Sequence, residues 1–135
     1  MSRLGILLRR NEQGAAAIEF ALAVPVLIMM IYGIFRVGLL YEANAGMQHA
    51  LGEGARLATL YERFTSNNQP TNDTIKAKMQ AKLFGKGDGN FTVADPVNGT
   101  GYKDLSITYT KRMNFIFIPG PTITLTRSKR AYTVS

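Results

Sequence analysis

The chain has 135 residues, a formal net charge of +7 and no cysteine. Its length suffices for one small domain beside a membrane helix, and the lack of cysteine excludes disulfides, thiol nucleophiles and Cys-based metal sites. The basic charge would suit nucleic acid, but an apolar segment near the N-terminus argues against that partner, and we expect no nucleic-acid binding.

A short basic leader, residues 1–14, opens the chain with the sequence MSRLGILLRRNEQG. Only Glu12 offsets its three arginines, Arg3, Arg9 and Arg10. Basic residues beside a first membrane helix hold that end in the cytoplasm. We therefore expect a single-pass protein of the bacterial inner membrane, with a cytoplasmic N-terminus and a periplasmic C-terminal domain.

An apolar segment, residues 15–35, follows the leader and contains a single charge, Glu19. At about 1.5 Å per residue, a helix of this length crosses the roughly 30 Å hydrocarbon core of a bilayer. We predict a transmembrane helix over residues 15–40, near whose outer end Arg36 can snorkel. A carboxylate inside it needs a partner or a route to the membrane surface. Pro25 should kink or loosen the helix because proline removes one backbone hydrogen bond.

Three interpretations of this start are open. A cleaved signal peptide could use the Ala-x-Ala sequence at residues 43–45, although its apolar region is normally only about 7–15 residues long. An uncleaved signal anchor accounts for the length and orientation but leaves Glu19 unexplained. Cleavage after Gly14 would instead make Ala15 the new N-terminus and Glu19 the fifth residue of the mature chain.

An amphipathic helix over residues 41–64 continues the membrane segment, so that one long helix covers residues 15–64. Gly46, Gly52 and Gly54 lower its helix preference by up to about 1 kcal/mol each. We expect them to permit close approach of the backbone to the domain or to a partner helix. Small and apolar residues recur at three- and four-residue spacing on the expected inner face: Met47, Ala50, Leu51, Ala55, Ala58 and Tyr61.

A basic leader that ends in glycine, a glutamate at mature position five and a long apolar helix together resemble a type IV prepilin. The sequence G-A-A-A-I-E-F-A-L at residues 14–22, the following Pro25, and G-E-G-A-R at residues 52–56 resemble TadE-like pilin proteins of the tight-adherence (Flp) secretion system. The resemblance covers residues 13–61. Major Flp pilins carry Glu-Tyr where this chain has Glu-Phe, and they are shorter, which favours a minor pilin or pseudopilin.

This resemblance implies that a membrane prepilin peptidase cleaves between Gly14 and Ala15. It also implies a subunit contact in which Glu19, with Phe20 beside it, meets the N-terminal amine of Ala15 in a neighbouring subunit. A proline such as Pro25 is compatible, in this family, with partial melting of the helix during extraction from the bilayer.

The partners implied are the prepilin peptidase, other pilin and minor pilin subunits, and the assembly platform in the inner membrane. The implied role is initiation or assembly of a pilus for surface attachment, and whether the protein lies in the extracellular filament, at its tip or only at its base stays open. The competing interpretation is a signal-anchored periplasmic scaffold of a secretion machine, which is neither cleaved nor polymerised.

Residues 65–135 predict a small periplasmic domain, which makes the whole chain α+β. A polar loop over residues 65–74 precedes a short helix over residues 75–84 that Asp73 or Thr74 would cap. Alternating apolar residues, bounded by turn-forming residues, predict an antiparallel sheet. Its strands are expected at residues 91–94, 103–113 and 122–134, with turns at residues 85–90 and 98–101.

The link over residues 114–121, NFIFIPGP, is apolar and broken by two prolines. We expect a wide connection whose apolar residues 115–118 face either the core or a membrane or partner surface.

No combination of residues in the sequence supports catalysis. His49 stands alone, and Asp88 and Asn90 in a glycine-rich turn miss the spacing of a calcium loop. We therefore expect no catalytic, cofactor-binding or metal site, and a chain that is the substrate of an enzyme rather than an enzyme.

Overall fold

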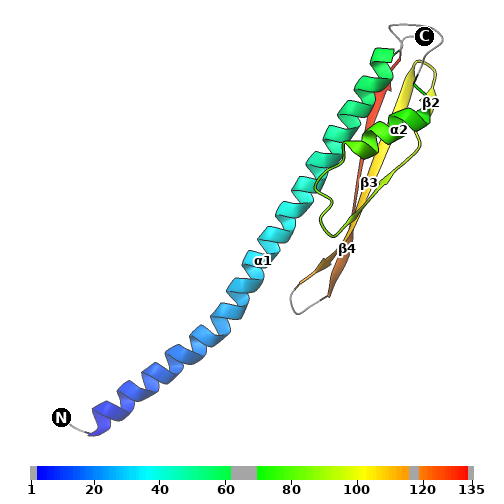
Figure 1. Cartoon of the computed structure of the whole chain (residues 1–135). Helices are drawn as coiled ribbons and strands as arrows, with labels where there is room; N and C mark the ends of the chain where they lie inside the picture. Colours follow the sequence, from blue (N-terminus) through cyan, green and yellow to red (C-terminus); the bar gives the residue numbers. More distant parts are fainter. Residues whose placement is uncertain (1–2, 62–69, 116–118, 134–135) are drawn as a thin grey trace.

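The computed structural model describes residues 3–61, 70–115 and 119–133, and the side chains of the first range from residue 14 to residue 60. One continuous helix, α1 (Arg3–Tyr61), runs through most of the predicted leader and far beyond the apolar segment. The other elements are α2 (Asn72–Ala81), β1 (Asn90–Val93), β2 (Val97–Gly99), β3 (Tyr102–Asn114) and β4 (Pro119–Tyr132). Of these, α2, β3 and β4 pack on the C-terminal half of α1 (Figure 1). The predicted α+β class is confirmed.

All four strands form one antiparallel sheet centred on β3. β4 pairs along one edge of β3, from Tyr102 opposite Tyr132 to Asn114 opposite Pro119. β1 and β2 pair with successive stretches of the other edge. The two long strands predicted at residues 103–113 and 122–134 are therefore confirmed as a hairpin, and the short strand predicted at residues 91–94 is β1.

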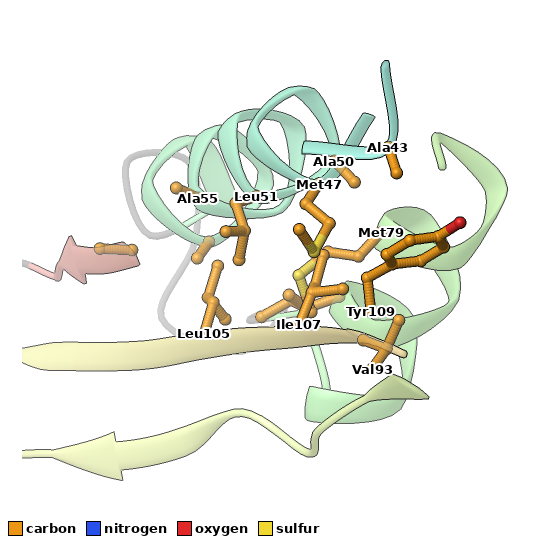
Figure 2. Packing of buried hydrophobic residues seen from close by; sticks show 13 residues of the cluster. Ala43, Met47, Ala50, Leu51, Ala55, Met79, Val93, Leu105, Ile107 and Tyr109 are labelled. Atoms are coloured by element: carbon orange, nitrogen blue, oxygen red, sulfur yellow. The ribbon is translucent and has the colours of Figure 1, made fainter. Parts of the chain in front are cut away.

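The core fills the space between α1, α2 and one face of the sheet (Figure 2). Alternation along β3 decides which face this is, because Leu105, Ile107 and Tyr109 are fully buried, as predicted. The side chain of Tyr61 lies outside the described side chains. The other residues predicted on the inner face of the helix are all buried, together with Ala43: Met47, Ala50, Leu51, Ala55 and Ala58.

Two glycines let the domain approach α1 closely. A Cβ atom on Gly46 would overlap the backbone carbonyl of Phe84, and one on Gly54 would lie 2.5 Å from Cγ of Met79. A Cβ atom on Gly52 would have no neighbour within 4 Å. The predicted close approach is therefore right for Gly46 and Gly54, and the group that approaches is the domain itself.

The cap predicted for α2 is wrong. Thr71 caps the helix, since its hydroxyl accepts a hydrogen bond of 3.2 Å from the backbone N–H of Thr74. Asp73 lies instead in the first turn, where the helix dipole stabilises a negative charge. α2 ends before the predicted residue 84, and the chain turns at Gly85, which has a φ of 73° and packs against the backbone of Glu42.

Two predicted connections are also shorter than expected. The first two residues of the turn predicted at residues 98–101 belong to β2, because pairing with β3 outweighs their turn-forming composition, and the turn itself is residues 100–101. The wide link predicted at residues 114–121 is narrowed by the pairing of Asn114 with Pro119. Prolines are tolerated there because β4 is an edge strand. The contacts expected for residues 116–118 lie outside the described residues.

Gly46→Ala and Gly52→Ala form a matched pair on one helix. Alanine raises helix propensity by up to about 1 kcal/mol at both positions. Because the new methyl group at residue 46 overlaps the carbonyl of Phe84, we expect a net loss of about 1–3 kcal/mol there. Gly52→Ala should be neutral or stabilising. Urea unfolding of the detergent-solubilised chain, followed by the near-UV circular dichroism of the buried Tyr109, measures the difference, and equal stabilities would contradict the close packing.

Candidate functional site

The N-terminal half of α1 presents an apolar surface, residues 15–35, that nothing else in the described part of the chain covers. Phe20, Leu22 and Phe35 are 71%, 70% and 62% exposed. The most apolar stretch of the helix has a mean hydropathy of 2.2 and none of it is buried. A core helix of a soluble domain would hide such residues, so the exposure is typical of a membrane anchor or a signal sequence. By length and composition, this helix can cross a membrane.

The residues predicted to take part in processing and assembly lie together at the start of this apolar surface. Gly14, Ala15, Glu19 and Phe20 are all exposed on α1, which continues unbroken across the bond between Gly14 and Ala15. A Cβ atom on Gly14 would meet nothing within 4 Å. Packing within the chain therefore does not require glycine at this position.

Glu19 lies one helical turn after Ala15, so the two residues share a face of α1. Among the side chains that the structure describes, no basic group forms an ion pair with Glu19. Its carboxylate is exposed beside the apolar residues that surround it.

Pro25 lies inside α1 and does not end it. The helix continues on both sides of this exposed residue and curves gently along its length (Figure 1). A local loosening at Pro25 stays a prediction that rests on the missing backbone hydrogen bond.

An ion-pair cluster lies at the end of the apolar surface and joins α1 to the domain. We call it the Asp88 cluster and define it as Tyr32, Arg36, Asp88 and Lys111. Nη1 of Arg36 lies 2.6 Å from Oδ2 of Asp88, and its Nε donates a hydrogen bond of 2.8 Å to the hydroxyl of Tyr32. The other carboxylate oxygen, Oδ1, lies 2.5 Å from Nζ of Lys111, whose side chain is fully buried. One carboxylate thus compensates a cation on the helix and a buried cation on β3.

Sequence reasoning missed this cluster. It expected Arg36 to snorkel along the membrane and treated Asp88 as a weak hint of a calcium loop. The structure pairs the two residues across a sequence separation of 52, which no local spacing reveals. The available signal was an acidic residue held in a glycine-rich turn, GKGDG, at residues 85–89.

Residues 14–56 match the family model of TadE-like protein. The match confirms the resemblance predicted from the sequence. It begins at the predicted cleavage glycine and covers the apolar surface and most of the buried face of α1. Comparisons with curated proteins and with solved structures gave no match.

The TadE-like segment carries no recognisable metal centre with the rest of the described chain. No group of three or more His, Cys, Asp or Glu residues within the described ranges could hold a metal ion. His49 packs against Phe84, with ring centroids 5.8 Å apart.

Pairing with two cations lowers the pKa of Asp88 to about 2. Lys111 contributes more to this shift than Arg36 does. Nζ of Lys111 has no hydrogen-bond partner among the described residues beyond this ion pair. A buried ammonium without compensation is strongly destabilising. Because Asp88 itself is half exposed, solvent screens part of the interaction.

Asp88 should make the stability of the domain depend on pH in acid. Its pKa lies below the ordinary value of 3.8, so the folded chain favours the charged form more than the unfolded chain does. The stabilisation is complete above about pH 5 and is lost as the pH falls through about 4 towards 2. Asp88→Asn should remove this part of the acid transition and lower the stability at pH 7, because Lys111 loses its ion-pair partner.

Asp95→Asn is the matched control, since Asp95 pairs with Lys76 at an exposed position. It should change the free energy of unfolding at pH 7 by no more than about 0.5–1 kcal/mol. Urea unfolding at several pH values between 2 and 7 measures both variants. An Asp88→Asn variant with the stability and the acid transition of the unmodified chain would contradict the role of this carboxylate.

Proposed function

We propose that this chain is a minor pilin or pseudopilin of a tight-adherence pilus, and that it is the substrate of a prepilin peptidase rather than an enzyme. One observation carries the proposal. The exposed apolar surface holds a single charge, Glu19, at the fifth position after Gly14, and no described side chain pairs with it. The match of residues 14–56 to the TadE-like family supports it.

The proposed processing creates a partner for Glu19, which pairs with none of the described side chains. Hydrolysis of the bond between Gly14 and Ala15 leaves a carboxylate on the leader and an α-ammonium group on Ala15. A carboxylate in the first turn of the shortened helix is favoured by the helix dipole. In a packed assembly, the ammonium group of one subunit then meets Glu19 of its neighbour, and two charges that are costly in an apolar environment compensate each other.

The apolar surface then has two successive roles. Before cleavage it anchors the chain in the inner membrane, and the domain lies on the periplasmic side. After cleavage the same side chains, such as the exposed Phe20, pack against the helices of other subunits. The charge pair at Glu19 sets the register of this packing. The sheet and the part of α1 beyond the membrane segment determine which partner fits.

The intact mass of the protein extracted from membranes of a host with the matching peptidase tests the cleavage. We expect Ala15 as the N-terminus. Gly14→Leu should retain the leader, because a bulky residue at the cleavage site blocks processing. Gly33→Leu is the matched control, since a Cβ atom there also meets nothing within 4 Å, and it should mature normally. An unprocessed mass for the unmodified chain would favour the uncleaved scaffold, and a fully processed Gly14→Leu would contradict the assigned bond.

Glu19→Gln tests the proposed subunit contact, because it removes the charge and keeps the size of the side chain. We expect normal membrane insertion and leader removal but a loss of most pili, since the α-ammonium of the neighbouring Ala15 loses its partner. Glu42→Gln is the same change at an exposed position of α1 beyond the apolar surface, and it should leave piliation unchanged. Electron microscopy of cells, with membrane fractionation beside it, gives the result. Normal piliation of Glu19→Gln would remove Glu19 from the mechanism.

A further inference from the structure

We propose that the end of the β3–β4 hairpin dips into the outer leaflet of the bilayer beside α1, as a second membrane contact of this protein. We define the hairpin end as residues 113–115 and 119–121. The inference rests on the membrane role proposed above for the apolar surface. It adds a lipid-contacting site to the domain, outside the helix.

The first step is the direction of β3, which runs antiparallel to α1. Near the start of β3, Cδ1 of Leu105 lies 3.3 Å from where a Cβ atom of Gly54 would be. Near its end, Lys111 is joined to Arg36 through the carboxylate of Asp88. Advancing along β3 therefore means moving back along α1 towards the apolar surface.

The second step is the depth that the hairpin end reaches. β3 continues from Lys111 to Asn114, and at about 3.3 Å per residue this adds roughly 10 Å. That distance equals about six or seven residues of α-helix. Counted from the level of Arg36, the hairpin end is level with about residue 29 or 30 of α1, one to two turns before the end of the apolar surface. Figure 1 shows the same arrangement, since the hairpin end points towards the N-terminus of α1 farther than the rest of the domain.

The third step compares the position of the hairpin end along α1 with the position of the bilayer. Residues 15–35, at about 1.5 Å each, span the roughly 30 Å of hydrocarbon without surplus. The outer boundary of the hydrocarbon then lies near Phe35, so that the hairpin end reaches about one to two helical turns past it into the outer leaflet.

The described residues of the hairpin end suit this environment. Phe115 is 37% exposed, and aromatic rings are favoured at the membrane interface. Pro119 and Pro121 are exposed on the edge strand, and they bring no N–H groups that lipid would leave without an acceptor. Lys86 and Arg112, both exposed next to residues of the Asp88 cluster, place cations where lipid phosphates lie.

A tryptophan reporter tests the contact on the full chain. The sequence contains no tryptophan, so Phe115→Trp gives a single fluorophore. The variant is reconstituted in vesicles of phosphatidylcholine and phosphatidylglycerol, with and without lipids brominated near the headgroup. We expect its emission to be shifted to the blue, to be largely lost in the brominated vesicles, and to resist aqueous iodide.

Two matched reporters separate this inference from the proposed anchor. Tyr132→Trp lies at the opposite end of the hairpin, where Tyr132 is 72% exposed, and iodide but not bromolipid should quench it. Val26→Trp lies within the apolar surface, and bromolipid should quench it. If Val26→Trp is quenched and Phe115→Trp behaves like Tyr132→Trp, the second contact is overturned and the anchor stands. If Val26→Trp is not quenched, the anchor fails and the second contact fails with it.

A second probe covers the case in which Phe115→Trp disturbs the packing of this ring near Gly120. The chain has no cysteine, so a nitroxide can be attached at Asn114→Cys and, as a control, at Thr100→Cys, both exposed. Relaxation by oxygen, which concentrates in lipid, should exceed relaxation by an aqueous nickel complex at residue 114, and the order should be reversed at residue 100. Equal preference for the aqueous agent at both sites would overturn the proposal.

Discussion

One helix has to face an apolar solvent along its first half and a protein core along its second, and this constraint organises the whole chain. Before Arg36, large apolar side chains are exposed along α1, and no element that the structure describes covers them. Beyond Arg36, one face of α1 consists of alanines with Met47 and Leu51, and Gly46 and Gly54 allow the domain to approach the helix closely. α2 and the sheet can therefore assemble only on the second half, which leaves the first half free for lipid or for other helices.

The Asp88 cluster lies where these two environments meet, and its charges explain the position of the loop over residues 85–89. Alternation along β3 would place an apolar residue at position 111, but a buried lysine stands there. Its ammonium group is held by the same carboxylate that holds Arg36. A buried ion pair adds little net stability, yet it tolerates no large displacement of its partners. The cluster therefore fixes the height of β3 along α1 and, with it, the depth of the hairpin.

Local sequence patterns correctly predicted the helices and strands that depend mainly on residues close together in the chain. The length of the apolar segment, the three- and four-residue spacing after it and the alternation around Ile107 depend on neighbouring residues alone, and they gave the long helix, its buried face and the β3–β4 hairpin. The sequence alone does not distinguish Thr71 from Asp73 and Thr74 as the cap of α2, because all three residue types are suitable. Gly52 and Gly54 cannot be distinguished in sequence because Met79, which crowds only Gly54, comes from another element. Asp88 was missed for the same reason. Glu19 could be located because its spacing from Gly14 is local.

Two membrane contacts on one chain would make departure from the bilayer a concerted step. The Asp88 cluster and the glycine contacts join the hairpin to α1, so the hairpin end leaves the interface when the helix moves outward by a few turns. The same movement uncovers Phe115 and the apolar surface together, at one level of the molecule. Burying both against neighbouring subunits would offset the loss of lipid contact, and helix packing in the filament would then require a site for the hairpin end on the adjacent subunit.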